Sequence, residues 1–231
     1  REGGNAIEGM VAAAAAIALT YPHMNGIGGD GFWLILPPDG APIGIEACGP
    51  AALAATPSLY REHGLSAIPA RGPLAANTVA GTVAGWQEAL AVSTARGGRL
   101  PLSRLLADAI FHAEQGVPVS RSQRATTIEK AGELGAMEGF AGAFAPERGG
   151  TVPALLRQPR LGRLLRDLAA AGLDDFYRGH TARRIAADLA AVGSPLTLRD
   201  LEQYRARRVE PLALRLGWGT AYNLPPPTQG L

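Results

Sequence analysis

The hydrophobic pattern predicts strands near both ends of the chain and helices between them. Alanine-rich positions from Ala12 to Leu19 indicate a first helix, for which Asn5 is a suitable N-cap. The apolar run 32–36 predicts a buried strand. A Pro-Pro-Asp-Gly turn at 37–40 follows, and 42–47 then returns as the second strand of a hairpin.

From Thr56 onward the pattern is helical. Thr56 and Pro57 are typical of an N-cap followed by proline at the first helical position, and Thr197 with Asp200 resembles a capping box. The small residues 73–84 predict a connection, and the glycine-rich stretch 139–150 predicts a second one. Helices are expected from Gly85, over 102–115 with Gly116 as the C-cap glycine, and over 120–137, 155–171, 181–192 and 197–201.

The stretch 212–222 alternates as one or two strands do. Strands at both ends and helices between them predict an α+β fold. We interpret residues 1–231 as a single partial domain with a helical block over roughly 56–205. Both ends of the chain look cut, which predicts a fragment of a longer protein.

Four glycines stand within six positions: Gly26, Gly28, Gly29 and Gly31. Glycine permits backbone angles and close approaches that a Cβ forbids, so this loop is expected to need them. A plain helix-to-strand connection is the alternative. Asp30 within the loop is expected to organise its backbone, with a side chain facing the active site as the alternative.

Composition and residue spacing disfavour several kinds of partner and site. The 231 residues carry a net charge of +2, and the basic side chains are almost all arginine, which does not favour nucleic acid. Cys48 is the only cysteine, so no intrachain disulfide can form. The four histidines have no metal-ligand spacing, and the glycine loop is not a dinucleotide motif; we expect no metal and no cofactor.

No apolar run of about 18 residues and no signal peptide is visible. Because Arg1 is not an initiator methionine, a targeting segment could precede it, and the localisation is unknown with the cytoplasm slightly favoured. The arginine run 199–215 is interpreted as a solvated face or a subunit contact.

Eight separate motifs, in order along the chain, resemble the large subunit of the γ-glutamyltransferase (γ-glutamyltranspeptidase) family. The segments that carry the resemblance are Gly3-Gly4-Asn5-Ala6, Tyr21-Pro22-His23, Gly28-Gly29-Asp30-Gly31-Phe32, 78–86, Leu100-Pro101-Leu102 leading to 113–116, Asp175-Phe176-Tyr177-Arg178-Gly179, 198–204 and 225–230.

The resemblance implies an N-terminal-nucleophile hydrolase with an αββα sandwich, of which this chain is the large-subunit part. Such a precursor cuts itself, and a threonine becomes the first residue of the small subunit, where its own α-amine serves as general base. That nucleophile is expected downstream of Leu231, so the chain should hold no catalytic residue and be inactive alone. Thr228 is given a structural role. The expected partners are the small subunit and a small amide substrate, and a higher oligomer stays open.

Substrate choice is where the sequence departs from the family. Typical γ-glutamyl-specific members place an arginine after the second strand, where it clamps the substrate's α-carboxylate. Here 45–51 holds no arginine, and none occurs between Arg1 and Arg61. The segments 30–33, 47–49 and 227–230 look instead like the oxamate amidohydrolase branch, whose substrate is a small oxalyl amide. A γ-glutamyl hydrolase or transferase is the alternative, and a non-catalytic scaffold relative is a second one.

Two residues at the end of the second strand are the candidates for substrate binding. Cys48 could line the pocket where the arginine is missing, although a buried core cysteine is the more ordinary interpretation. Glu46 could orient pocket residues, or be an exposed hairpin glutamate.

Overall fold

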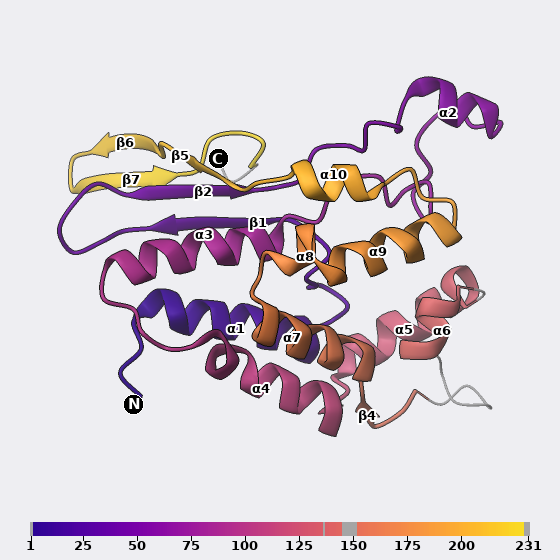
Figure 1. Cartoon of the computed structure of the whole chain (residues 1–231), viewed down its shortest axis with the longest axis horizontal. Helices are drawn as coiled ribbons and strands as arrows, with labels where there is room; N and C mark the ends of the chain where they lie inside the picture. Colours follow the sequence, from indigo (N-terminus) through magenta and orange to yellow (C-terminus); the bar gives the residue numbers. More distant parts are fainter. Residues whose placement is uncertain (1, 136, 145–151, 229–231) are drawn as a thin grey trace. The chain divides into compact units, whose positions relative to one another are not determined.

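The computed structural model describes residues 2–135, 137–144 and 152–228, and they form helices and short antiparallel sheets (Figure 1). The contacts between Cα positions divide the chain into two compact units, residues 1–26 with 99–170 and residues 27–98 with 171–231. The prediction of one partial domain stays a prediction.

The first unit is mainly helical. Its elements are α1 (Ala6–Thr20), α4 (Leu102–Gln115), β3 (Val117–Pro118), α5 (Arg121–Leu134), α6 (Glu138–Phe144), β4 (Leu155–Leu156) and nearly all of α7 (Pro159–Ala171). Helices α1 and α4 pack against each other, and their fully buried side chains include Val11, Leu19 and Leu106.

The start of α1 is fixed by a buried carboxylate. Asn5 Oδ1 accepts the Glu8 N–H at 3.0 Å, and Glu8 Oε2 accepts the Asn5 N–H at 2.8 Å, which completes a capping box. Glu8 Oε1 also accepts the Leu100 N–H at 2.8 Å, and only 2% of Glu8 is exposed. The predicted N-cap at Asn5 is therefore confirmed, and the carboxylate additionally ties α1 to the segment before α4.

The second unit contains the sheet. Its elements are β1 (Gly31–Ile35), β2 (Ile43–Ala47), α2 (Pro57–Glu62), α3 (Thr82–Ala95), α8 (Asp175–Arg178), α9 (His180–Ala191), α10 (Leu198–Gln203), β5 (Arg207–Val209), β6 (Leu212–Leu216) and β7 (Gly219–Asn223). Strand β2 lies between β1 and β5, antiparallel to both, and β6 pairs with β7.

Helix α3 covers one face of this sheet (Figure 1). Ile45 and Ala47 of β2 are fully buried, and Gly85 of α3 lies close to Trp33 of β1, which is paired with Ile45. Because side chains alternate along a strand, Glu46 and the residue after the strand end, Cys48, belong to the opposite face. Because α3 covers one face of the sheet, only the β2 side chains on the opposite face, such as Glu46, are available to form a site.

The loop glycines differ in how closely other atoms approach them: a Cβ at Gly31 would lie 3.2 Å from Thr82 Cα. A Cβ at Gly28 or Gly29 would meet nothing within 4 Å, and neither residue has a positive φ. The expectation that these positions need glycine is wrong there. Close approach is real at Gly81, where a Cβ would lie 1.9 Å from Ala47 O, and at Gly49, where it would lie 1.7 Å from Val79 O.

The loop itself is held at the start of α3. Gly29 O accepts the backbone N–H groups of Gly81 and Thr82, at 2.8 and 2.9 Å. The Thr82 hydroxyl lies 2.9 Å from both Gly29 O and Asp30 O. Asp30 takes part in this anchoring through its backbone carbonyl.

Several element boundaries differ from the prediction. Helix α3 begins at Thr82, inside the expected connection 73–84, because the loop carbonyls hold the first turn. Leu155 and Leu156 form a strand paired with β3, and the helix begins only at Pro159. Glu138–Phe144 is helical, contrary to the expected glycine-rich connection, whose residues 145–150 lie outside the described ones.

Other expectations are confirmed. The hairpin of β1 and β2, the helix Leu102–Gln115 with Gly116 at φ 94°, and the N-cap Thr56 occur where the sequence predicts them. The capping box of Thr197 and Asp200 is present as well.

Candidate functional site

A pocket of about 570 Å³ opens at the end of β2, within the second unit. It is lined by the end of β2 and the residues after it, by the end of α10, and by the start of β5. Its walls include both residues singled out from the sequence, Glu46 and Cys48, and also Asp200, Tyr204, Arg205 and Arg207.

Glu46 and Arg207 lie directly opposite each other in the β2–β5 register. Arg207 Nη2 donates to Glu46 Oε1 at 2.5 Å, and the Cys48 thiol lies 3.6 Å from the same oxygen. Only 11% of the Glu46 side chain is exposed, against 70% of Arg207. The alternative of an exposed hairpin glutamate is therefore wrong.

Cys48 is half-buried on the pocket wall, so the alternative of a buried core cysteine is wrong too. Burial raises the pKa of its thiol, and the negative charges of Glu46 and Asp30 raise it further. The thiol is therefore protonated at neutral pH and is not an activated nucleophile. A role of Glu46 and Cys48 in substrate binding stays a prediction.

The carboxylate of Asp200 belongs to the frame of the pocket. Asp200 Oδ1 accepts the Leu53 N–H at 2.9 Å, while Oδ2 accepts from the Thr197 N–H at 2.8 Å and the Thr197 hydroxyl at 2.6 Å. Burial alone would raise the pKa of Asp200, but these hydrogen bonds outweigh it and hold the pKa below its usual value. One side chain thus caps α10 and fixes the segment after β2.

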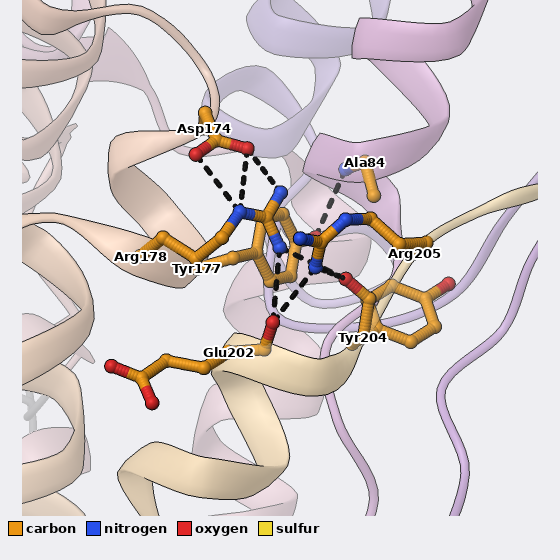
Figure 2. Close-up of polar contacts among 7 residues, drawn as sticks. All are labelled: Ala84, Asp174, Tyr177, Arg178, Glu202, Tyr204 and Arg205. Carbon is orange, nitrogen blue, oxygen red and sulfur yellow. Dashed lines mark hydrogen bonds and ion pairs between the residues drawn. The ribbon is translucent and has the colours of Figure 1, made fainter.

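The turn from α10 into β5 is held by two arginines. Figure 2 shows Arg178 between the carboxylate of Asp174 and the main-chain carbonyls of Glu202 and Tyr204. Arg205 Nη1 donates to the same two carbonyls, at 2.7 Å each. The segment that carries Tyr204, Arg205 and Arg207 is therefore tied to α8.

Two neighbouring tyrosines differ in their hydrogen bonds. The Tyr177 hydroxyl donates to Ala80 O at 2.8 Å and accepts the Ala84 N–H at 2.9 Å. The Tyr204 ring packs beside it, with centroids 5.5 Å apart, but the buried Tyr204 hydroxyl has no partner among the described residues. Burial raises the pKa of both hydroxyls.

The pocket residues that sequence reasoning missed come from the arginine run. Arg207 and Arg208 belong to β5, which pairs with β2, and Arg208 Nε donates to Glu88 Oε2 at 3.1 Å from the other face. The run is therefore not only a solvated face. A three-residue strand has too weak a pattern to be predicted, and only its pairing with β2 reveals Arg207.

Thr228 belongs to the proline segment 225–230, where a structural role is expected for it. Thr228 Oγ1 donates to the carbonyls of Leu224 and Pro225, at 2.8 and 2.9 Å, which fits the structural role given to it.

In the described ranges, no group of three or more His, Cys, Asp or Glu could hold a metal ion. Within those ranges no helix has the length and apolar character to cross a membrane.

The mixed α+β fold is that of the N-terminal-nucleophile hydrolases of the gamma-glutamyltranspeptidase type. The chain belongs to the gamma-glutamyltranspeptidase family, whose family model matches residues 1–231. The predicted family and fold class are thereby confirmed.

Among individual proteins, the chain is 56% identical to the oxamate amidohydrolase proenzyme of Klebsiella pneumoniae over 237 residues, which cover 100% of this chain and 44% of that protein. It is 33% identical to the glutathione hydrolase proenzyme of Pseudomonas aeruginosa, covering 100% of this chain and 40% of that protein. The chain thus spans less than half the length of these curated relatives.

Solved structures show the same fold. The gamma-glutamyltranspeptidase from Pseudomonas nitroreducens complexed with L-DON matches with a TM-score of 0.85 and 33% identity, over 98% of this chain and 66% of that chain. The enzyme of the same name from Helicobacter pylori matches with a TM-score of 0.88 and 29% identity, over 99% of this chain and 66% of that chain.

Proposed function

We propose that this chain is the large-subunit portion of a self-cleaving amide hydrolase that acts on a small, oxamate-like amide. The observation that carries the proposal is the 56% identity to an oxamate amidohydrolase proenzyme across the whole chain, against 30 to 35% for relatives named as glutathione hydrolase or glutathione hydrolase-like proenzymes. The proenzyme names of these relatives also support self-cleavage and a small subunit from the same precursor.

The proposed nucleophile is a threonine in the precursor beyond Leu231. Its hydroxyl attacks the amide carbonyl, an ester to the threonine oxygen forms, and the C–N bond breaks with release of ammonia after proton transfer to nitrogen. Water then cleaves the ester, which returns the threonine and yields oxalate when the amide is oxamate. The large subunit contributes the pocket wall formed by Glu46 and Cys48. The segment 45–51, which contains both residues, lacks the arginine that γ-glutamyl-specific members place after the second strand.

A γ-glutamyl hydrolase or transferase is the second candidate. It is favoured by identities of 30 to 33% to several glutathione hydrolase proenzymes and by the structural similarity to two gamma-glutamyltranspeptidases. Such an enzyme would have to hold the substrate's α-carboxylate through a residue other than the missing arginine.

The full-length precursor tests the proposal. We expect it to yield two bands on a denaturing gel and to release ammonia from oxamate. A cleaved protein that releases aniline only from a γ-glutamyl anilide would favour the second candidate. A precursor that never cleaves and turns over neither compound would favour a non-catalytic scaffold.

A further inference from the structure

The charged groups of the pocket are distributed unequally between its interior wall and its accessible surface. The two carboxylates, Glu46 and Asp200, are largely buried, and their oxygens already accept hydrogen bonds. The two guanidinium groups, of Arg205 and Arg207, belong to exposed residues. A solute entering the pocket therefore meets cations before it meets anions.

Arg207 is oriented by its partner across the strands. Its Nη2 donates to Glu46 Oε1, and among the described residues this side chain makes no other hydrogen bond or ion pair. A guanidinium has five N–H donors in a fixed fork, so this single bond orients the group and leaves most donors available. Since 70% of the side chain is exposed, those donors are accessible from the pocket.

Arg205 adds a second positive charge, which makes no ion pair within 4 Å among the described residues but acts on the carboxylate of Asp174 from farther away. Its Nη1 donates to two main-chain carbonyls, of Glu202 and Tyr204, and these carry no net charge (Figure 2). Arg205 and Arg207 are two positions apart, and both line the pocket. Arg208, between Arg207 and Val209, points to Glu88 on the other face.

We propose that Arg207, assisted by Arg205, forms a carboxylate subsite in this pocket and determines specificity for a small amide whose carboxylate adjoins the amide carbon. The inference rests on the proposed function and deepens it. The guanidinium of Arg207 comes from β5, where Arg207 lies directly opposite Glu46 in the strand register. Glu46 acts as the residue that positions this guanidinium. This subsite would hold a carboxylate beside the strand end at which Cys48 stands.

Calorimetric binding of oxalate to the cleaved full-length protein tests the subsite without relying on turnover. We expect Arg207→Gln to weaken oxalate binding roughly 10- to 100-fold, the usual range for losing hydrogen bonds to a charged group. Arg208→Gln is the matched control, because it removes the same charge one residue away on the other face, and it should change binding no more than about twofold.

Arg207→Gln leaves Glu46 without its ion-pair partner and could impair folding. The double variant Glu46→Gln with Arg207→Gln removes both charges, and we expect the same loss of oxalate binding in a folded, cleaved protein. Wild-type affinity in a folded Arg207 variant, equal losses in the Arg207 and Arg208 variants, or no binding to the wild type would each overturn the inference.

The outcomes separate this inference from the proposed function. A protein that turns over oxamate but keeps its oxalate affinity in Arg207→Gln would retain the function and lose the subsite. A protein that binds oxalate through Arg207 yet turns over only a γ-glutamyl anilide would retain the subsite and lose the function.

Discussion

At the scale of single residues, the candidate site depends on how each polar group is satisfied. Glu46, Asp200 and Tyr177 each use polar atoms within the second unit, and truncating Asp200 or Tyr177 would leave buried donors or acceptors unpaired. The Tyr204 hydroxyl is the exception among these pocket and frame residues, because it is buried without a partner in the described ranges. These differences give distinct expectations for similar substitutions.

The tyrosine pair provides a matched comparison. We expect Tyr177→Phe to destabilise the full-length protein by about 1–3 kcal/mol, because the Ala84 N–H and the Ala80 carbonyl lose their partner. Tyr204→Phe removes an unpartnered hydroxyl and should be neutral or stabilising by up to about 1 kcal/mol. Urea-unfolding midpoints measure both; equal losses in the two variants would contradict this account.

The Cys48 thiol should react slowly at neutral pH. Burial and the charges of Glu46 and Asp30 raise its pKa above the usual 9.0, so the thiolate needed for alkylation forms only at higher pH in the native state than in the unfolded state. Iodoacetamide labelling against pH, with Cys48→Ala as the blank, measures the inflection. A native inflection at or below that of the urea-unfolded protein would refute the expectation.

At the scale of elements, short strands and caps bring the site together. Strand β5 has only three residues, yet it places Arg207 opposite Glu46, and the α10 cap at Asp200 fixes Leu53 in the segment after β2. The Arg178 contacts hold the turn between α10 and β5. The pocket is thus built by elements that are too short to be stable alone.

Asp200 makes the α10 region sensitive to acid. Its pKa is lowered on folding, so it stabilises the native state above its usual value of 3.8, and that stabilisation is lost as the pH falls through the lower folded value. We expect Asp200→Asn to cost about 1–3 kcal/mol at pH 7 and progressively less below about pH 4.

Unfolding free energies measured between pH 7 and pH 3 check this prediction. The control is Asp39→Asn, since the Asp39 side chain is 88% exposed and its ion pair with Arg96 should contribute little. A cost of Asp200→Asn that did not change with pH would show that the carboxylate charge is not responsible.

At the scale of the whole molecule, the family and the α+β fold class could be predicted because they rest on long patterns and on motifs spread over the chain. The capping residues Asn5, Thr56 and Thr197 were also predictable, since capping is local chemistry. Glu46 and Cys48 could be singled out because they end a clear strand.

The rest of the site depends on long-range pairing. Arg207 contacts a residue 161 positions away, and no local signal marks it within the arginine run. The strand Leu155–Leu156 was missed for the same reason, because its pairing with β3 overrides the apolar pattern that favours a helix. Gly28 and Gly29 of the loop were overinterpreted, since a Cβ there would meet nothing within 4 Å, whereas Gly49 and Gly81 are crowded.

The most direct test of the central claim is a comparison of substrates with the self-cleaved full-length protein. We predict that kcat/KM for ammonia release from oxamate exceeds kcat/KM for a γ-glutamyl anilide at least about a hundredfold. The reason is that a site whose polar groups bind one substrate discriminates strongly against a substrate that leaves those groups unpaired. A protein that hydrolyses the γ-glutamyl anilide and leaves oxamate intact would contradict the proposed substrate class.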